Sequence, residues 1–282
     1  MLDSLRHHHA ELLAALFAIT VVAVAWLEVF RPRRPVTASR APRWTANLTL
    51  GAVNTVLFML AVPLGAFAAA IVAEQHGWGV LRLMSLPAWL AIALGVLAID
   101  LSGYVIHRLM HGVPALWRLH HVHHSDIDID FTTTVRHHPV ESLVTVVMVS
   151  MATIAWGVPP ESVVLQLIAA TLFDVTNHSN LTIPRGLDRW ARRLVVTPDM
   201  HLAHHSSLKR ETDSNYGTVL ALWDRWLGTY VAVPAAGVAG MTIGLEYRRD
   251  PADQRLDRLL WSPFIKRLPA APANRTAAAI PE

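Results

Sequence analysis

A series of long apolar segments constrains the fold of this chain more than any other feature. Residues 12–30 are nearly all apolar, and a helix of that length spans roughly 28 Å, enough to cross the hydrocarbon core of a bilayer. A second apolar stretch covers residues 46–73 and contains Pro63, which predicts a kinked or broken span. A third covers residues 86–106. The sequence therefore predicts an all-α integral membrane protein.

Composition and charge support this prediction. Only 16% of the residues are charged, against about 25% in soluble domains, which argues against a large soluble helical protein. A cleaved signal peptide is the alternative for residues 12–30, but the apolar core is long and no small-residue cleavage site precedes Arg31. The net charge is a modest +3 and basic residues lie beside apolar spans, so no nucleic-acid partner is expected.

The charges also predict an orientation. Residues 31–43 contain five arginines, and short basic loops stay on the cytoplasmic side of a membrane. Two shorter apolar runs, 143–156 and 161–173, are separated by Gly157, Pro159 and Pro160. They predict a helical hairpin (143–173) that dips into or nearly crosses the membrane, or else two strained spans. Either arrangement brings the chain back to the side that it left.

Histidines gather directly after the third span. Residues 107–124, HRLMHGVPALWRLHHVHH, hold six of the sixteen histidines. They contain the spacings HxxxH and HxxHH, and a second HxxHH follows at residues 201–205. Positions i, i+3 and i+4 share one face of a helix, whereas His121 falls about 100° away from its neighbours' face.

These spacings predict metal binding, because neutral imidazole is a ligand for iron, zinc, copper and nickel. The candidate ligands are His107, His111, His120, His123, His124, His201, His204 and His205. A structural zinc ion needs about four ligands, so eight predict two metal ions. His7, His8 and His9 are contiguous, close to the terminus and without helical spacing, and we do not expect them to bind metal.

Three carboxylates are candidates for holding these imidazoles. Asp100 lies seven residues before His107, two helical turns back on nearly the same face. A carboxylate within an apolar span is costly unless it is paired, and ligating histidines commonly donate their second N–H to a carboxylate. We expect Asp100 to hold His107, with a purely structural helix contact as the alternative. Glu141 and Asp213 are further candidates of this kind.

With these motifs, residues 96–230 resemble the fatty acid hydroxylase/sterol desaturase superfamily of membrane di-iron enzymes. The matching motifs are DLSGYVIHRLMH, LWRLHHVHHS, RHHPVE, NHSN, TPDMHLAHHS, DSNYG and LWDRWLGTY. The resemblance implies a cytoplasm-facing site with two iron ions, which zinc can replace in a crystal. It implies that O2 is activated to hydroxylate or desaturate an acyl chain or a sterol-like lipid from the bilayer.

The resemblance also adds site residues. It implies that His178 is a ninth ligand, with a polar residue at a helix end as the alternative. His138 is implied to be either a further ligand or a pocket residue, whereas the preceding His137 departs from the family pattern and is expected to be exposed. Asp174 stands where some members have another histidine; it ligates metal, hydrogen-bonds a ligand, or does neither.

Three regions follow from this organisation. Residues 1–95 form an N-terminal transmembrane region, and residues 96–230 form the histidine-rich catalytic region with the hairpin and a cytoplasmic helical cap. Residues 231–282 form a C-terminal interfacial segment, with an amphipathic helix at 256–268, and a disordered tail. About three spans plus the hairpin are expected in all.

The electrons for such a reaction are expected from outside. The chain has no cysteine, which excludes cysteine-ligated iron–sulfur clusters, and it has no GxGxxG or GxxxxGK[ST] motif. A ferredoxin or similar reductase system is therefore the expected donor. Arg136, Arg192, Arg193 and Lys209 are candidates for docking an acidic carrier or, alternatively, for binding anionic lipid.

Other classes of protein fit the pattern less well. A metal transporter or metal-binding membrane protein is the main alternative, but its ionisable ligands would lie near the middle of the membrane, and these histidines lie at span ends. A zinc metalloprotease would carry HExxH, which is absent. The choice between hydroxylation and desaturation, and the identity of the substrate, remain open at this stage.

Overall fold

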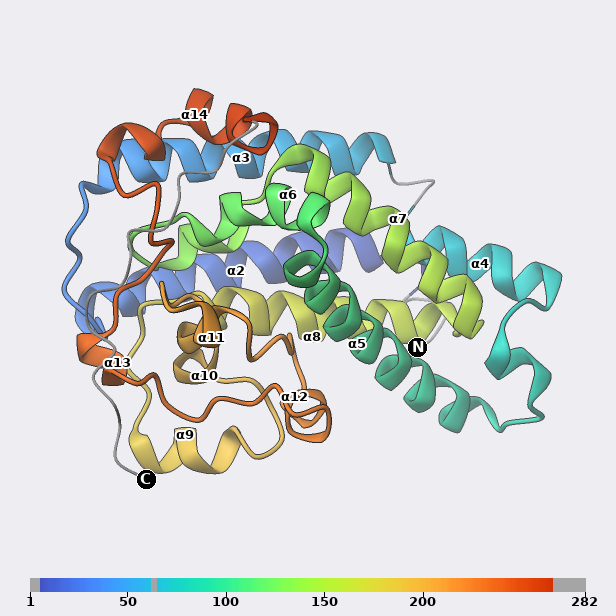
Figure 1. Cartoon of the computed structure of the whole chain (residues 1–282). Coiled ribbons are helices and arrows are strands. Elements are labelled where there is room, and N and C mark those ends of the chain that lie inside the picture. The colour runs from blue at the N-terminus through green and yellow to red at the C-terminus, as the bar shows by residue number, and fades with distance from the viewer. Residues whose placement is uncertain (1–5, 62–64, 266–282) are drawn as a thin grey trace.

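The computed structural model describes residues 6–61 and 65–265, and this part of the chain is built from helices. Its only β-type pairings are isolated bridges, such as Ser206 with Ile243. Five long helices and the shorter α4 form an elongated bundle (Figure 1): α2 His9–Phe30, α3 Arg40–Ala61, α4 Ala66–His76, α5 Ala88–Gly112, α7 Pro139–Trp156 and α8 Pro160–Asn177. The predicted all-α class is confirmed.

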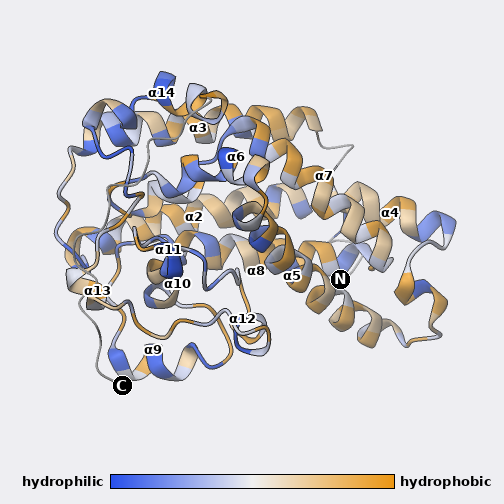
Figure 2. Cartoon of the chain, viewed as in Figure 1, coloured by the Kyte–Doolittle hydropathy of each residue, from blue (hydrophilic) through white to orange (hydrophobic). Residues whose placement is uncertain are grey.

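In the part of the chain that the structure describes, four segments are long and apolar enough to cross a membrane. They are His9–Phe30, Arg40–Leu83, Ala88–Gly112 and Pro139–Trp156. Figure 2 shows hydrophobic residues along these helices, and many of their large apolar side chains are exposed, including Ile19, Leu60 and Met151. Exposed apolar side chains on long helices are expected where lipid replaces water as the solvent. The integral membrane class predicted from the sequence is supported.

The predicted break at Pro63 and the predicted hairpin each correspond to a pair of helices. Pro63 lies outside the described residues, and α3 and α4 are separate helices on either side of it. The hairpin is confirmed as α7 and α8, with α2 and α5 packed against α8. Its first arm is longer than the apolar run 143–156, because α7 begins at Pro139, and this arm is itself long enough to cross a membrane.

The hairpin turn lies at the bundle end remote from the histidines. Gly157 closes α7 with φ of 67°, a conformation that favours glycine, and a Cβ added there would lie 2.3 Å from the carbonyl oxygen of Trp78. Arg82 donates to the Gly157 carbonyl at 3.0 Å. At the same end, Arg6 pairs with both Glu74 and Glu161. Close backbone approach and ion pairs thus fix this end of the bundle.

The opposite end carries a cap of short helices. These are α6 Pro114–His124, η3 Phe131–Val135, α9 Arg185–Ala191, α10 Pro198–His204, α11 Lys209–Thr212, α12 Leu222–Trp226, α13 Gly237–Gly240, η4 Pro251–Gln254, α14 Leu256–Trp261 and η5 Ser262–Phe264. A short 3-10 turn, η2 Val80–Leu83, lies at the far end instead. In Figure 1, α14 lies along α3, and α9, α10, α11 and α12 gather on the other side of the bundle, in the lower left of the view.

The arginine-rich loop 31–43 holds this cap in place. Arg33 Nε lies 2.9 Å from Oδ1 of Asp199, a residue that stands just before the histidines of α10. Arg34 Nη2 donates to the Met241 carbonyl at 2.7 Å. The buried Arg43 pairs with Asp126 at 3.0 Å and also with Asp130. The loop and the histidines therefore lie at the same end of the bundle, as the sequence predicts.

One surface prediction is wrong. Arg136 is fully buried and donates to the Val122 carbonyl and to Asn47 Oδ1, so it cannot offer a carrier a docking charge. The amphipathic helix predicted at 256–268 is shorter in the structure, α14 Leu256–Trp261; its Leu259 packs with Leu50 of α3, whereas Trp261 is exposed. Residues 266–282, which include the predicted disordered tail, lie outside the described residues.

Candidate metal centre

The nine histidines singled out from the sequence converge from four elements. The helix α5 runs unbroken through the end of its apolar run and presents His107 and His111 in its last two turns. Pro114 starts α6 as its first residue, a position where proline's missing N–H costs nothing. The remaining ligand candidates lie on α6, at the end of α8 and on α10: His120, His123, His124, His178, His201, His204 and His205.

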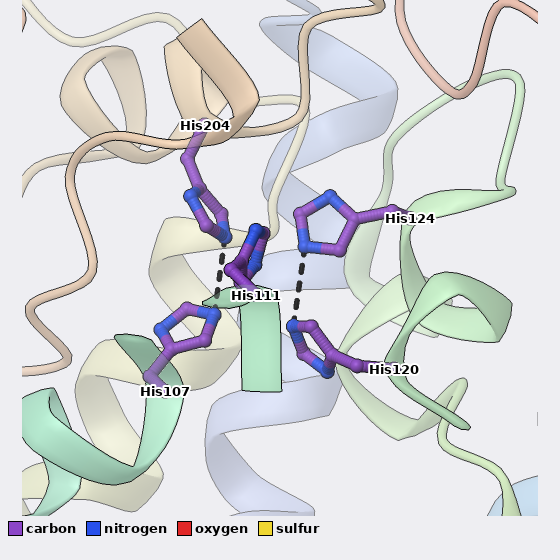
Figure 3. A group of neighbouring side chains, drawn as sticks. All are labelled: His107, His111, His120, His124 and His204. Carbon is purple, nitrogen blue, oxygen red and sulfur yellow. Dashed lines mark hydrogen bonds between the residues drawn. The ribbon is translucent and has the colours of Figure 1, made fainter. Parts of the chain in front are cut away.

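These side chains form two groups. The first histidine group (Figure 3) is His107, His111, His120, His124 and His204, and the second histidine group is His123, His178, His201 and His205; within each, the ligand atoms lie within 4.8 Å of one another. The groups adjoin, because the rings of His124 and His205 stack with centroids 4.7 Å apart. Each HxxHH motif contributes to both groups, so the two groups are built together.

Hydrogen bonds fix which nitrogen faces inward in the first group. His107 Nδ1 donates to the Tyr216 carbonyl at 2.9 Å, and His204 Nδ1 donates to the Ser214 carbonyl at 2.6 Å. A neutral imidazole that is protonated at Nδ1 carries a lone pair at Nε2. Yet the two Nε2 atoms lie only 3.1 Å apart (Figure 3). Two lone pairs at this distance repel each other, and a cation between them would remove that repulsion.

The second group also brings Nε2 atoms together, around His178. His178 Nδ1 donates to the Asp174 carbonyl at 2.8 Å, so its Nε2 also carries a lone pair. That atom lies 3.0 Å from His123 Nε2 and 2.9 Å from His201 Nε2. Buried imidazole nitrogens without a hydrogen-bond partner occur in both groups, namely His111 Nδ1 and Nε2 in the first and His123 Nδ1 and His201 Nδ1 in the second. This donor set fits transition-metal ions.

Burial keeps the cap imidazoles neutral. It lowers the pKa well below the ordinary value, with neighbouring histidines adding to the effect, for His123, His124, His201, His204 and His205. Burial likewise lowers the pKa of His178 to about 4. Neutral imidazole is the form that binds metal, so these histidines are in the ligating form at neutral pH without deprotonation.

Two of the predicted carboxylates reach the site. Glu141 Oε1 accepts from His120 Nδ1 at 2.7 Å and from His137 Nδ1 at 3.0 Å. Asp213 Oδ1 lies 3.5 Å from His111 Nδ1, near the site but without a hydrogen bond to it. A carboxylate that accepts from the outer nitrogen, as Glu141 does from His120, orients an imidazole and raises its basicity.

Asp100 does not hold His107, and this expectation is wrong. Its two oxygens accept from Gln166 Nε2 and Trp223 Nε1, each at 2.7 Å. Seven residues of helix place a side chain on the same face but also about 10 Å further along the axis, beyond hydrogen-bonding reach. Asp174 contributes its backbone carbonyl to His178, which the sequence could not show.

The remaining histidines lie outside the two groups, although His137 forms a third possible ligand set with His120 and Glu141. His138 caps α7, its Nδ1 accepting from the Val140 N–H at 3.1 Å, and is not in either group. His121 points away from both groups, with Nε2 2.9 Å from Ser262 Oγ. His137 was expected to be exposed but is half-buried, stacked on His123 at 4.5 Å. His9 stacks on Phe67, far from the site.

The carbonyl acceptors at Ser214 and Tyr216 could not be predicted from the sequence. Backbone carbonyls have no residue preference, although both lie in the DSNYG motif. Beside them, a groove of about 690 Å³ reaches the first histidine group, with His111 in its wall. Tyr216 and Leu109 also line it. The groove connects the site to the surface of α5.

The site-bearing region matches known proteins. Residues 92–229 match the model of the fatty acid hydroxylase family. The chain is 29% identical to alkylglycerol monooxygenase of Xenopus tropicalis, over 58% of this chain and 36% of that protein. It is 32% identical to the ornithine lipid hydroxylase OlsE of Rhizobium tropici, over 51% of this chain and 43% of that protein.

A third relative is the fatty acid hydroxylase vlmA of Lecanicillium sp, 28% identical over 66% of this chain and 52% of that protein. The chain therefore spans between 36% and 52% of the length of these three relatives. No solved structure matches it significantly.

Proposed function

Because this chain belongs to the fatty acid hydroxylase family through residues 92–229, we propose that it is a membrane-bound, metal-dependent oxygenase that hydroxylates a lipid. The observation that carries the proposal is the pair of buried histidine groups whose ligand nitrogens converge within 4.8 Å of one another, with the Nε2 lone pairs of His107 and His204 directed at each other. A structural role would not require nine imidazoles to be desolvated at one place.

The residues that would hold metal are the histidines of the two groups. The first histidine group would hold one ion and the second histidine group the other. We propose iron for both, and imidazole sites also bind zinc well. Bound iron would supply the oxidising power, drawn from O2, that attack on an unactivated C–H bond needs and that no ordinary side chain offers.

The chain's own residues would prepare this site. The carbonyls of Ser214 and Tyr216 hold His204 and His107 with Nε2 directed inward. Glu141 does the same for His120. The surrounding helices bury the imidazoles, which excludes bulk water from the place of reaction and prevents loss of the oxidant to side reactions. Preorganised ligands of this kind need no rearrangement during turnover.

Lipid hydroxylation is favoured over desaturation by the relatives, which are named as monooxygenases and hydroxylases. The candidate spans would admit a substrate directly from the bilayer, and the groove at His111 would admit its chain. We propose that the two electrons come from a separate donor such as a ferredoxin or similar reductase system, because the chain has no cysteine for an iron–sulfur cluster.

Metal analysis of paired variants tests the metal assignment. We expect two ions per chain, and a loss of one ion each from the pair His120→Ala with His204→Ala and the pair His201→Ala with His205→Ala. Substituting His7, His8 and His9 is the matched control and should leave the metal content unchanged. One ion in the native chain, or no loss in either pair, would contradict the assignment.

Turnover tests the reaction. The iron-loaded chain in detergent micelles with bilayer lipids, O2, NAD(P)H and a ferredoxin with its reductase should form hydroxylated lipid, and should form none when ferredoxin and reductase are omitted. Metal binding with no oxygenated lipid under any donor would favour the alternative, a metal-binding or metal-transporting membrane protein.

A further inference from the structure

The groove beside the first histidine group is formed largely by one side of α5. Tyr104, Arg108 and His111 line it at spacings of four and three residues, and Val105, Leu109 and Gly112 form a second, parallel row. These spacings place both rows on adjacent strips of one helical face. A ligand lying along this face would run from the bilayer-facing part of α5 to His111.

Apolar side chains dominate the entrance. Val105 is 43% exposed on α5, and Leu227, after α12, is 47% exposed on the opposite wall. Val105 is part of a helix that is long and apolar enough to cross a membrane, and Leu227 lies beside this helix. An apolar channel that opens on a membrane helix suits a hydrocarbon chain, which would leave the bilayer without passing through water.

The charges at the rim are unbalanced. Lys209 pairs with Asp213, whereas Arg108 is exposed and, within residues 6–61 and 65–265, no carboxylate forms an ion pair with it. Arg108 lies within the last turns of the candidate span Ala88–Gly112. A long basic side chain near the end of a span extends to the level of the lipid headgroups. One uncompensated guanidinium thus lies where a headgroup would lie.

From this arrangement we propose that the groove selects a lipid with an anionic headgroup. Arg108 binds the headgroup's phosphate or carboxylate, so that the chain begins about one helical turn from His111 and lies against Leu109 and Val105. The planar guanidinium donates two parallel hydrogen bonds to either anion, so the two headgroup chemistries share one binding mode. The inference rests on the proposed lipid hydroxylation and specifies its substrate class.

Equilibrium binding measures this selectivity without turnover. The full chain, loaded with metal in neutral detergent micelles, is titrated with three radiolabelled lipids that share palmitoyl chains: dipalmitoylphosphatidylglycerol, palmitate and dipalmitoylglycerol. We expect at least one anionic lipid to bind about tenfold more tightly than the uncharged one, as expected for a charge-assisted hydrogen bond. The phosphatidylglycerol and palmitate arms show which anion is preferred.

Charge variants locate the selectivity. Arg108→Gln should remove the tenfold preference, while Arg189→Gln, which changes an equally exposed arginine on α9 outside the groove, should keep it. Equal binding of all three lipids by the native chain, or an unchanged preference in Arg108→Gln, would overturn the proposal.

A paired glycine substitution tests the path of the chain. A Cβ added at Gly112 or at Gly103 meets no heavy atom within 4 Å, but only Gly112 lines the groove. Gly112→Leu should weaken binding of all three lipids about tenfold or more, and Gly103→Leu should not. Equal effects of the two substitutions would place the chain elsewhere.

Metal content and turnover separate the two proposals. Normal metal content and lipid hydroxylation without headgroup selectivity would refute the headgroup inference and leave the proposed function intact. Selective binding that depends on Arg108, without metal or hydroxylation, would refute the proposed function alone.

Discussion

One oxygen of Glu141 contacts a histidine of the first group directly and is linked to the second group through His137. Glu141 Oε1 accepts from His120, a member of the first histidine group, and from His137. The His137 ring stacks on His123 of the second group with centroids 4.5 Å apart. Glu141 therefore orients one candidate ligand directly and supports another through an aromatic contact.

Substitution of this carboxylate should weaken metal binding. In Glu141→Gln, an amide replaces the charged acceptor between two imidazole donors, and loss of such a partner typically lowers metal affinity 10- to 100-fold. Competition with a graded series of chelators measures the change. His138→Ala is the control, because His138 caps α7: it should cost about 1 kcal/mol of unfolding free energy and leave metal affinity unchanged. Equal metal affinities in both variants would contradict the role of Glu141.

At this scale the sequence predicted which side chains meet but not what holds them. Helical spacing predicted eight of the nine candidate imidazoles, because i, i+3 and i+4 positions share a face wherever a helix forms, and the family resemblance added His178. The same reasoning failed for Asp100, because it accounts for rotation about the helix axis and ignores the rise along it. The acceptors for His107 and His204 are backbone carbonyls, whose positions depend on the tertiary fold of residues 213–217.

Among the elements, Asp100 acts as a junction between helices. It lies on α5, accepts from Gln166 on α8 and from Trp223 on α12, and is buried. Its second oxygen also accepts from the Leu220 N–H at 3.3 Å. The carboxylate is thereby satisfied within an apolar region, where an unpaired one would be costly.

Removal of this junction should destabilise the fold before it affects metal binding. Asp100→Ala leaves buried amide and indole donors unsatisfied, at about 1–3 kcal/mol each, and Asp100→Asn, which keeps one carbonyl acceptor, should cost less. Thermal unfolding in detergent measures both variants beside metal content. A normal unfolding temperature together with lost metal in Asp100→Ala would instead show that Asp100 serves the histidines.

Helix ends, by contrast, were poorly predicted from the apolar runs. The run 86–106 stops at the first histidine, yet α5 continues to Gly112; the run 143–156 misses the first turn of α7 at Pro139. Hydrophobicity reports the length of chain that faces lipid, whereas a helix continues as long as its backbone hydrogen bonds do. His107 and His111 lie on the polar extension of α5, beyond the reach of a hydropathy pattern.

For the molecule as a whole, the buried histidines predict acid sensitivity. Burial lowers the pKa of His178 to about 4 and that of His121 to about 3, against about 6.5 in an unfolded chain. Between these values the unfolded state binds more protons than the folded state, so stability decreases as pH falls. Each such histidine contributes about 1.4 kcal/mol per pH unit. Metal-free protein should therefore show a falling unfolding temperature from pH 6.5 to pH 4, and a constant one would contradict the depressed pKa values.

The charges at the two ends of the bundle predict how the molecule lies in the membrane. The arginine-rich loop 31–43 and the histidine groups share one end of the bundle, and Arg6, Glu74, Arg82 and Glu161 occupy the other. The first end carries basic residues that are partly unmatched by acid, whereas the second has two bases and two acids. Since short basic loops remain in the cytoplasm, we expect the histidine end to face the cytoplasm.

The absence of cysteine from the sequence makes single-cysteine labelling clean. Thr182 and Arg210 are exposed at the histidine end, and His76 is exposed at the end of α4. In right-side-out vesicles, an impermeant maleimide should label His76→Cys at once, and should label Thr182→Cys and Arg210→Cys only after permeabilisation. The reverse pattern would keep the fold but place the site outside the cell. Equal labelling of His76→Cys and Thr182→Cys would mean that the two ends share one side, and the bundle could not then span the membrane.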